Sequence, residues 1–204
     1  MTDLGERYER HHREHRAGGD FVFVTERIPL FRAAIGRGKR VLDLGCRSGA
    51  LTKHFLEGNT VVGLDVDRAA LAKAAALGIE TVAADVEDPL PFPDESFDAV
   101  VAGELLEHLR FPDELVAEIR RVLRPGGVLV GSVPNAFNVQ NRLRFLRGLP
   151  PERDRTHLHM FRPQDLEELL RTFERVRLTF VGGRYVRLSA RLFAQDIVFS
   201  ALRP

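Results

Sequence analysis

The feature that most restricts the fold is an alternation of short apolar runs with helix-like stretches through the middle of the chain. Five runs rich in Val, Ile and Leu have the length of strands: 40–45, 60–65, 79–84, 97–103 and 127–133. Helical patterns lie between them near 48–57, 67–77 and 113–123. Strands that alternate with helices predict a parallel sheet with helices on both faces, and nearly continuous apolar runs suit strands buried on both sides.

Proline and glycine mark the boundaries of this pattern. The sequence RPGG at 124–127 is expected to close one helix and open the fifth strand, and Pro89, Pro91 and Pro93 interrupt the chain before the fourth strand.

Helix-like and strand-like stretches also follow one another in the last third of the chain. A basic amphipathic stretch covers 138–147, and a helix is predicted near 163–172 with Pro163 in its first turn. Two further strand-like runs, 174–182 and 196–204, are expected to complete the sheet. The predicted fold is therefore α/β: a Rossmann-like, doubly wound, mostly parallel seven-stranded sheet with helices on both faces.

Composition limits the class of protein. A chain of 204 residues with 44% apolar side chains is sufficient for one domain with a substantial core. No run has the roughly 18 to 20 apolar residues of a membrane span, and the N-terminal stretch is too charged for a secretory signal. One cysteine, Cys46, excludes an internal disulfide. We expect a soluble cytoplasmic protein without a membrane span.

Charge is distributed unevenly. Residues 137–204 hold 13 basic and 7 acidic side chains, a difference of +6, although the whole chain has a net charge of +1. A cationic third can favour RNA or an anionic substrate, but its arginines are scattered along amphipathic elements and also fit a solvated surface.

Polar and glycine residues gather where the first four predicted strands end. The segments are DLGCRSG, DVD, ADVED and GELLEHL, in chain order. In an open parallel sheet the ligand crevice lies beyond the carboxyl ends of the strands, near the point where strand order reverses.

These segments suit a purine nucleoside. Gly45 and Gly49 permit a tight turn and close approach of a ligand to main-chain amides. Asp65 can accept hydrogen bonds from vicinal ribose hydroxyls, as in dinucleotide-binding proteins. Asp85 can accept from an exocyclic amine while the N–H of Val86 donates to a ring nitrogen.

Spacing separates the possible nucleoside cofactors. The dinucleotide fingerprint is G-x-G-x-x-G, whereas this loop is G-x-x-x-G and lacks two of those glycines. Asp43, just before the loop, would repel phosphate and would attract a sulfonium and an α-amino group. A pyrophosphate is therefore not expected.

With these residues in view, the sequences VLDLGCRSG, VVGLDVD, AADVEDPLPFPDESFDAVVAGELLEHL and LRPGGVLVGSVPN resemble the successive motifs of the class I S-adenosylmethionine-dependent methyltransferases. The resemblance covers about 38–136. The tail, SVPNAFNVQNRLRFLRG with THLHMF, is more loosely similar to the branch that includes the methionine-biosynthesis protein W and related small-molecule methyltransferases.

The resemblance implies S-adenosylmethionine as cofactor and S-adenosylhomocysteine as product. The positions that it assigns to cofactor binding are Asp43, Gly45, Cys46, Arg47, Gly49, Asp65, Val66, Asp85, Val86, Gly103, Glu104 and Leu105. It divides the chain into an N-terminal helical cap at 1–37, the cofactor-binding core at 38–136, and a substrate-lid segment with the last helix and strands at 137–204.

Arg47 departs from the family pattern, which usually has glycine there. If the position needs a positive φ, arginine is strained and the loop is reshaped. Alternatively, its guanidinium covers the cofactor carboxylate. The sequence leaves both readings open.

Histidines are the candidate catalytic groups. His157 and His159 are spaced i, i+2, so both point to one face of an extended segment, where an imidazole can act as general base. His108, beside Glu107, could form an acid–base pair or orient a loop. The spacing of the two tail histidines permits metal ligation, but no third ligand is evident, so no metal is predicted. Cys46 has no visible base beside it and is not expected to be a nucleophile.

The acceptor is expected to bind in a site that is covered by the segment 135–161 and the N-terminal helix. Tyr8 and Phe21 would close over the cofactor, and His11, His12 and His15 are expected to be solvent-exposed. The candidate acceptor-binding residues are Tyr8, Asn135, Arg155, His157 and His159.

The expected activity is in-line methyl transfer to an O, N or S atom of a small molecule, by a monomer or homodimer. Nucleic acid is not expected, because GELLEHL resembles neither the Asn-Pro-Pro-aromatic motif nor the Pro-Cys motif of nucleic-acid methyltransferases. An RNA methyltransferase, a non-catalytic cofactor-binding partner of a biosynthetic enzyme, and a dinucleotide-dependent oxidoreductase remain the alternatives.

Overall fold

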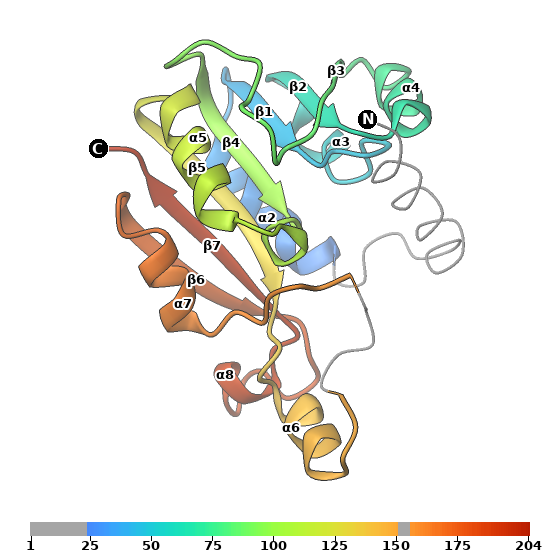
Figure 1. Cartoon of the computed structure of the whole chain (residues 1–204), viewed down its shortest axis with the longest axis vertical. Helices are drawn as coiled ribbons and strands as arrows, with labels where there is room; N and C mark the ends of the chain where they lie inside the picture. The colour runs from blue at the N-terminus through green and yellow to red at the C-terminus, as the bar shows by residue number, and fades with distance from the viewer. Residues whose placement is uncertain (1–23, 151–155) are drawn as a thin grey trace.

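The computed structural model describes residues 24–150 and 156–204. Its centre is a seven-stranded sheet with the order β3-β2-β1-β4-β5-β7-β6 (Figure 1). The strands are β1 Arg40–Leu44, β2 Thr60–Asp65, β3 Glu80–Ala83, β4 Phe97–Gly103, β5 Leu123–Pro134, β6 Glu174–Val181 and β7 Asp196–Leu202. The order reverses between β1 and β4, the neighbours in the middle of the sheet.

The five N-terminal strands are parallel, and β7 inserts antiparallel between β5 and β6. The strands β1 and β4 are apolar on both faces, and Val41, Leu42, Val100 and Val101 are completely buried. Such strands require cover on both sides. The predicted fold class is confirmed, with one antiparallel hairpin at the C-terminal edge.

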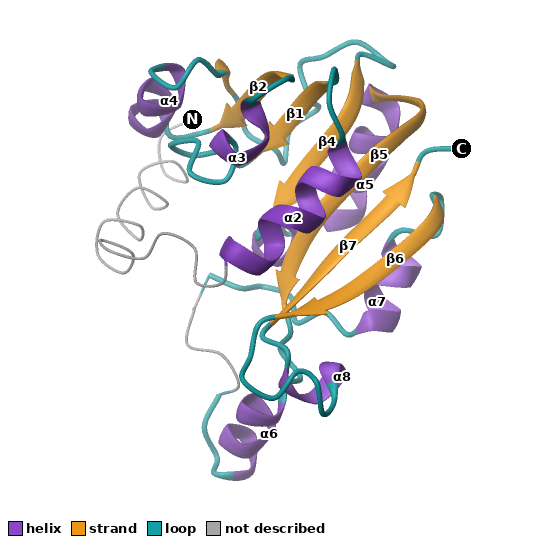
Figure 2. Cartoon of the chain, turned by 180° about the vertical axis from the view of Figure 1, so that it is seen from behind, coloured by secondary structure: helices purple, strands orange, loops and turns teal. Residues whose placement is uncertain are grey.

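Helices provide that cover. The described helices are α2 Val24–Ile35, α3 Lys53–Leu56, α4 Arg68–Ala75, the 3-10 turn η1 Leu106–His108, α5 Pro112–Val122, α6 Val139–Leu146, α7 Pro163–Leu169 and α8 Ala190–Phe193. Helices α5 and α7 lie on one face of the sheet (Figure 1), and α2 crosses the opposite face (Figure 2). Two apolar clusters fill the layers, one around Phe97, Leu123 and Phe199 and the other around Phe31 and Val101.

One local prediction was wrong. The helix expected over 48–57 is only the single turn α3, because turns occupy the chain up to Thr52 and Gly49 has φ +76°. RPGG lies just after α5 and in the opening residues of β5, as predicted, although the strand begins at Leu123. The pairing of β4 with β5 jumps from Leu123 to Val128 across it, so RPGG forms an irregularity in the strand.

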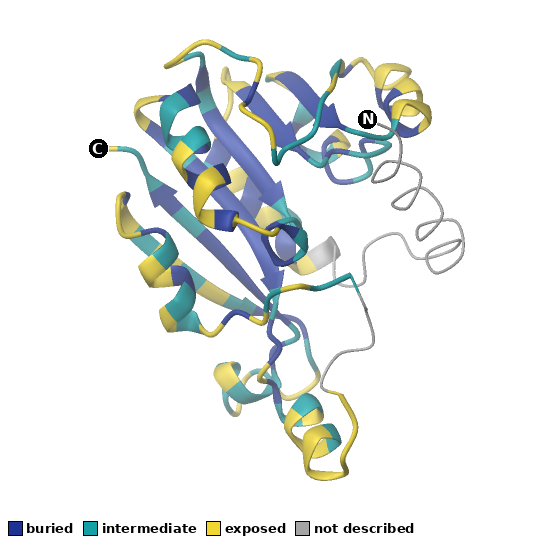
Figure 3. Cartoon of the chain, in the orientation of Figure 1, coloured by how far each residue is buried: buried dark blue, intermediate teal, exposed yellow. Residues whose placement is uncertain are grey.

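The segment around α6 and α8 extends beyond the end of the sheet and is largely exposed (Figure 3). Of the expected N-terminal cap at 1–37, the described part contributes α2. Tyr8, His11, His12, His15 and Phe21 lie outside the described residues, as does Arg155. Within 24–150 and 156–204, no helix is long and apolar enough to cross a membrane.

Candidate functional site

The carboxyl ends of the first four strands lie together at the same end of the sheet. Leu44 of β1 pairs with Leu64 of β2 and with Ala102 of β4, while Asp65 pairs with Ala83 of β3. The segments that follow these strands therefore start side by side at the reversal of strand order, which is where parallel sheets of this type form ligand crevices. The structure brings together the four polar segments that the sequence placed at strand ends.

The loop after β1 has a strained residue in it. Gly45 has φ +69° and Gly49 φ +76°, and Arg47 between them has φ +50°. A positive φ is favoured by glycine and costs a side-chain-bearing residue on the order of 1–3 kcal/mol. The first interpretation of Arg47 required a positive φ at this position, and that condition is met.

Hydrogen bonds hold this loop against the end of β2. The backbone N–H of Arg47 donates to Oδ2 of Asp65 at 2.9 Å, and the N–H of Asp67 donates to Oδ1 at 2.8 Å. Asp65 is buried, and this burial raises the pKa of its carboxyl, while the two N–H donors lower it. Each oxygen has a second lone pair, so the same carboxylate can also accept from a pair of hydroxyl groups.

Asp43 lies deeper, on β1. It is 2% exposed, and the hydroxyl of Thr52 donates to its Oδ2 at 2.5 Å. Burial, opposed by that hydrogen bond and reinforced by the charge of Asp65, raises the pKa of Asp43 to about 7. A cation beside this carboxyl would favour its ionised form.

Some of the predicted cofactor residues are explained by packing. A Cβ on Gly49 would lie 2.6 Å from Cδ1 of Ile79, and one on Gly103 would lie 2.8 Å from Cδ2 of Leu51. A side chain at either position would have to displace the end of Ile79 or Leu51, and the φ of +76° at Gly49 also favours glycine there. Gly45 is less crowded, since a Cβ there would lie 3.2 Å from Cδ1 of Leu105, but its φ of +69° favours glycine.

Cys46 points its side chain into the fold. Its Sγ lies against Gly63 of β2, where a Cβ would be only 2.5 Å away, and the residue is buried. Burial, with the charges of Asp43 and Asp65, raises the pKa of the thiol. A buried thiol with a raised pKa is a poor nucleophile, and the absence of a catalytic role for Cys46 stays a prediction.

Asp85 and Val86 follow β3. Oδ1 of Asp85 accepts from the N–H of Glu87 at 2.9 Å, which fixes the turn. Val86 packs on the larger apolar cluster and also lines a groove of about 150 Å³ that continues between Glu87 and helix α5. Val66, at the neighbouring tip, is partly exposed.

The end of β4 carries a second strained residue and an unexpected partner. Glu104 has φ +52°, and its Oε1 lies 3.0 Å from Nη1 of Arg27 on α2. Arg27 is 5% exposed, and its Nη2 also lies 2.6 Å from Oδ2 of Asp196 on β7. Its Nη1 donates to Oγ of Ser132 at 3.4 Å. The buried guanidinium therefore joins α2, β5 and β7 to Glu104.

Sequence reasoning missed Arg27, although a signal was present. Arg27, Phe31 and Ile35 are spaced four residues apart, so they share one face of a helix. Phe31 and Ile35 are apolar and buried, which places the arginine on the face that meets the sheet.

Beyond Glu104 the chain enters η1, where Glu107 and His108 lie. Glu107 is 1% exposed, and its carbonyl oxygen accepts from the N–H groups of Leu158 at 2.7 Å and His159 at 3.1 Å. The Nδ1 of His108 lies 3.3 Å from the carbonyl oxygen of Thr156 and 3.1 Å from its hydroxyl. These contacts attach the tail segment to the end of β4.

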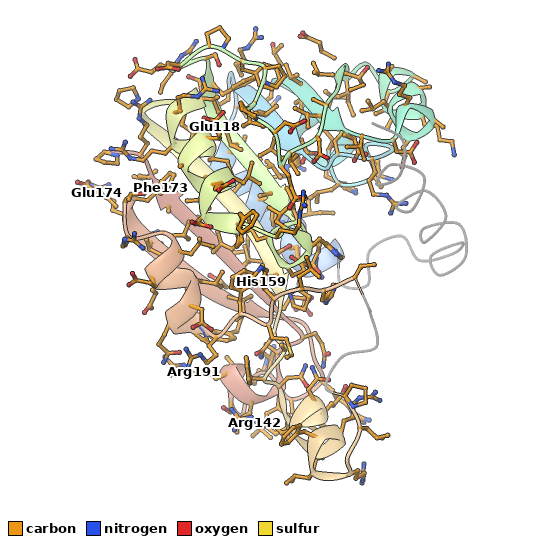
Figure 4. All side chains as sticks on the ribbon, viewed as in Figure 1. Glu118, Arg142, His159, Phe173, Glu174 and Arg191 are labelled. Atoms are coloured by element: carbon orange, nitrogen blue, oxygen red, sulfur yellow. The ribbon has the colours of Figure 1, made fainter. Side chains whose placement is uncertain are left out.

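The tail histidines then fall on one face, as their spacing predicts. His157 and His159 are half-buried, whereas Leu158 between them is exposed. The ring of His157 packs edge-on against that of His108, with centroids 4.7 Å apart. His159 instead stacks on Phe161 at 5.7 Å and, in Figure 4, lies near the carboxyl ends of β4 and β5. The three candidate catalytic histidines thus come from two segments that meet at this edge.

The side chain of Asn135 is engaged in hydrogen bonds within the fold. It is 3% exposed, and its Nδ2 donates to the carbonyl oxygens of Arg191 and Ala194, both at 3.0 Å. Both amide hydrogens are therefore used to hold α8 against the end of β5. The proposed contact between Asn135 and an acceptor would have to use its carbonyl oxygen.

The arrangement has a definite chemical character. Four acidic side chains, Asp43, Asp65, Glu104 and Glu107, lie at or next to the ends of β1, β2 and β4. Carboxylates accept hydrogen bonds from hydroxyl and amino groups and attract cations, whereas they repel a pyrophosphate. The residues present fit S-adenosylmethionine, which carries a sulfonium, an amino group and two ribose hydroxyls.

Comparisons with known proteins agree with this geometry. A family model described as a methyltransferase domain matches residues 42–131. The chain is 31% identical over 172 residues to the ubiquinone biosynthesis O-methyltransferase of Alkalilimnicola ehrlichii, covering 78% of this chain and 69% of that protein. It is 40% identical over 120 residues to the protein of the same description from Hahella chejuensis, covering 55% and 48%.

The fold is shared with a solved structure described as a SAM-dependent methyltransferase from Archaeoglobus fulgidus. The TM-score is 0.75 at 20% identity, and the match covers 98% of this chain and all of the other. The chain spans about half the length of the Hahella relative. From the sequence matches and the shared fold, the chain belongs to the class I S-adenosylmethionine-dependent methyltransferases.

Proposed function

We propose that the protein transfers the methyl group of S-adenosylmethionine to a small-molecule acceptor. The observation that carries the proposal is the pairing at the tips of β2 and β3. Asp65, buried and oriented by two N–H donors, pairs with Ala83, the last residue of β3, so Asp85 lies two residues beyond the end of the neighbouring strand. Two carboxylates at adjacent strand ends suit the ribose and the adenine of one nucleoside.

Each end of the cofactor has its own residues in this proposal. Asp65 accepts from the ribose hydroxyls, and Asp85 with the N–H of Val86 reads the adenine edge. Asp43 and Glu104 face the cationic methionine end. Arg27 is a positioning residue, because it contacts the carboxylate of Glu104 at 3.0 Å and is itself held by Asp196.

The bound cofactor supplies a methyl group that is already activated by its sulfonium. The remaining task of the protein is to hold the acceptor atom in line with the methyl group and to exclude water, and such positioning can account for a large part of a rate enhancement. Arg27 of helix α2 contacts Glu104, and Leu158 and His159 of the tail segment contact Glu107, so both segments are close enough to help exclude solvent from the site. A hydroxyl, amine or thiol acceptor must also lose a proton, for which His108, His157 and His159 are the candidate bases.

An oxygen is the accepting atom that we favour. Both ubiquinone-biosynthesis relatives are described as O-methyltransferases. The acceptor is proposed to bind beside His108 and His157, where the tail segment meets the end of β4, with Tyr8 and Arg155 as further candidates.

Calorimetric titration tests the cofactor assignment. Purified protein is titrated with S-adenosylmethionine, S-adenosylhomocysteine and NAD in turn. We expect both adenosyl ligands to bind and NAD to bind at least about tenfold more weakly, a difference of about 1.4 kcal/mol. Tighter binding of NAD would contradict the proposal and favour a dinucleotide-dependent enzyme.

Incorporation of isotopically labelled methyl tests the acceptor class. The protein is incubated with labelled cofactor and either a small-molecule extract or total RNA. Label in small molecules supports the proposal, while label in RNA supports the nucleic-acid alternative. Cofactor binding without any transfer would support a non-catalytic partner of another enzyme.

A further inference from the structure

A carboxylate and two imidazoles converge beside the proposed acceptor site. One ligand atom each from Glu107, His108 and His157 lie within 4.8 Å of one another. We propose that these three residues bind a divalent transition-metal ion, and that the chemistry of the site is that of a zinc-type centre with an open position.

The cluster is assembled by tertiary contacts. Glu107 and His108 belong to η1 after β4, while His157 belongs to the tail segment. The carbonyl oxygen of Glu107 accepts from the N–H groups of Leu158 and His159, which brings His157 to the ring of His108. The backbone carbonyl of Glu107, itself a proposed ligand, therefore holds the tail segment that carries His157.

The donor set selects the metal. Two histidines with one glutamate are typical of zinc sites that have three protein ligands and keep a fourth position for water or substrate. Imidazole nitrogen suits Zn²⁺, Co²⁺ and other transition ions, whereas Mg²⁺ and Ca²⁺ prefer oxygen donors. The cluster is mostly shielded from solvent, since the side chains of Glu107 and His108 are 1% and 9% exposed.

The hydrogen bonding of His108 fits a ligand. Its Nδ1 lies 3.1 Å from the hydroxyl and 3.3 Å from the carbonyl oxygen of Thr156, and both oxygens can accept when the hydrogen is on Nδ1, the tautomer that leaves the lone pair on Nε2. Nε2 is the atom 4.0 Å from Oε1 of Glu107. Metal-binding histidines commonly donate their second ring N–H to a carbonyl in this way, which fixes the tautomer.

Metal binding requires a small contraction. Bonds of about 2.0–2.2 Å in a tetrahedral zinc site place the donor atoms roughly 3.3 Å apart. The separations here, 4.0 Å between Glu107 and His108 and at most 4.8 Å in the cluster, are wider. The proposed site therefore requires the three side chains to rotate toward a common centre.

The open position gives the metal a role in the reaction, and this role rests on the proposed methyl transfer. An acceptor hydroxyl bound there loses its proton to solvent more readily, because a divalent cation stabilises the oxygen anion. The oxygen then forms a bond to the methyl carbon as the carbon–sulfur bond breaks, and the electron pair of that bond goes to the sulfur. The products are the methyl ether and neutral S-adenosylhomocysteine.

Metal binding by itself tests the site. His11, His12 and His15 are replaced by asparagine in every sample, because three histidines within five residues can bind added metal. The full chain is stripped with chelator and titrated with ZnCl₂ by calorimetry, and with CoCl₂ by visible absorption, which detects nitrogen and oxygen ligands around the cobalt. We expect one equivalent of each metal to bind.

Three variants then identify the ligands. His157→Asn and Glu107→Gln should each weaken zinc binding by at least about 100-fold and abolish the cobalt spectrum, since loss of an outer partner alone costs about 10–100-fold. His159→Asn is the matched control: its ring stacks on Phe161 and provides none of the three ligand atoms, so zinc binding should persist. Circular dichroism confirms that each variant is folded.

No zinc or cobalt binding in the parent protein would overturn the proposal, as would unchanged binding in folded His157→Asn or an equal loss in His159→Asn. S-adenosylhomocysteine is titrated into the same samples. Protein that binds the nucleoside but no metal contradicts only the metal site, whereas protein that binds metal but no nucleoside contradicts the proposed methyl transfer.

Discussion

The guanidinium of Arg27 lies 3.0 Å from the carboxylate of Glu104, so a helix near the N-terminus holds the residue at the tip of β4. Glu104 also adopts φ +52°, a conformation that persists only where its surroundings determine it. The second contact of Arg27, with Asp196, connects the same point to β7. Strain at the candidate site is thus balanced by a buried ion-pair network.

Removing the arginine should destabilise the fold strongly. Arg27→Met leaves the buried carboxylate of Asp196 and the carboxylate of Glu104 without this cation, and breaking a buried ion pair typically costs about 3–5 kcal/mol. Urea unfolding measures the change. Arg37→Met is the control, because its pair with Glu57 is exposed and such pairs contribute about 0–1 kcal/mol. Equal effects of the two substitutions would contradict a central role for Arg27.

Asp65 should determine affinity for the adenosyl group. Asp65→Asn keeps the shape of the side chain but removes the charge and one acceptor, so binding of S-adenosylhomocysteine should weaken by about 1–3 kcal/mol in a calorimetric titration. Asp98→Asn is the control, because it is the same chemical change at the start of β4, at the opposite end of the parallel strands. An unchanged dissociation constant in the Asp65 variant would count against the site.

Arg47 allows strain and guanidinium chemistry to be separated. Arg47→Gly relieves the left-handed conformation and should raise the free energy of unfolding by about 1 kcal/mol, within the range expected for such strain. Arg47→Ala removes the guanidinium but keeps the strain. If the guanidinium contacts the cofactor carboxylate, both variants lose affinity for S-adenosylmethionine; if it does not, affinity stays the same in the alanine variant.

Asp43 should make stability depend on pH. Because its pKa is raised to about 7 in the folded state, from 3.8 as the ordinary value, the folded protein binds this proton more tightly than the unfolded chain. The contribution is fully present below about pH 4 and is lost as the pH rises to about 7, at about 1.4 kcal/mol per pKa unit.

The measurement compares the cofactor-free protein with Asp43→Asn by urea unfolding between pH 4 and pH 8. Asparagine at this position does not titrate. As the pH rises, the free energy of unfolding of the parent should therefore fall relative to that of the variant. A difference that stays constant over this range would show that burial does not hold the Asp43 proton.

The alternating pattern of apolar runs and helical stretches was enough to predict the sheet, since parallel strands buried on both faces leave a strong signal in their own residues. Val41 and Leu42 on β1 and Val100 on β4 are completely buried, as that signal requires. The position of Asp65 was equally predictable, because strand ends follow directly from strand boundaries. The single turn at α3 and the irregular pairing of β5 with β4 at RPGG were not, because both depend on neighbouring strands.

By itself, the sequence determined the order of strands and helices, the acids at the strand tips and the family motifs, because these depend on periodicity and on residues close in the chain. Tertiary structure alone decided that Arg27 meets Glu104, that Asn135 is used to hold α8, and that His157 joins Glu107 and His108. Each of these contacts joins segments far apart in the chain. Its partners are selected by the packing of helices and loops against the finished sheet, which local residue patterns do not record.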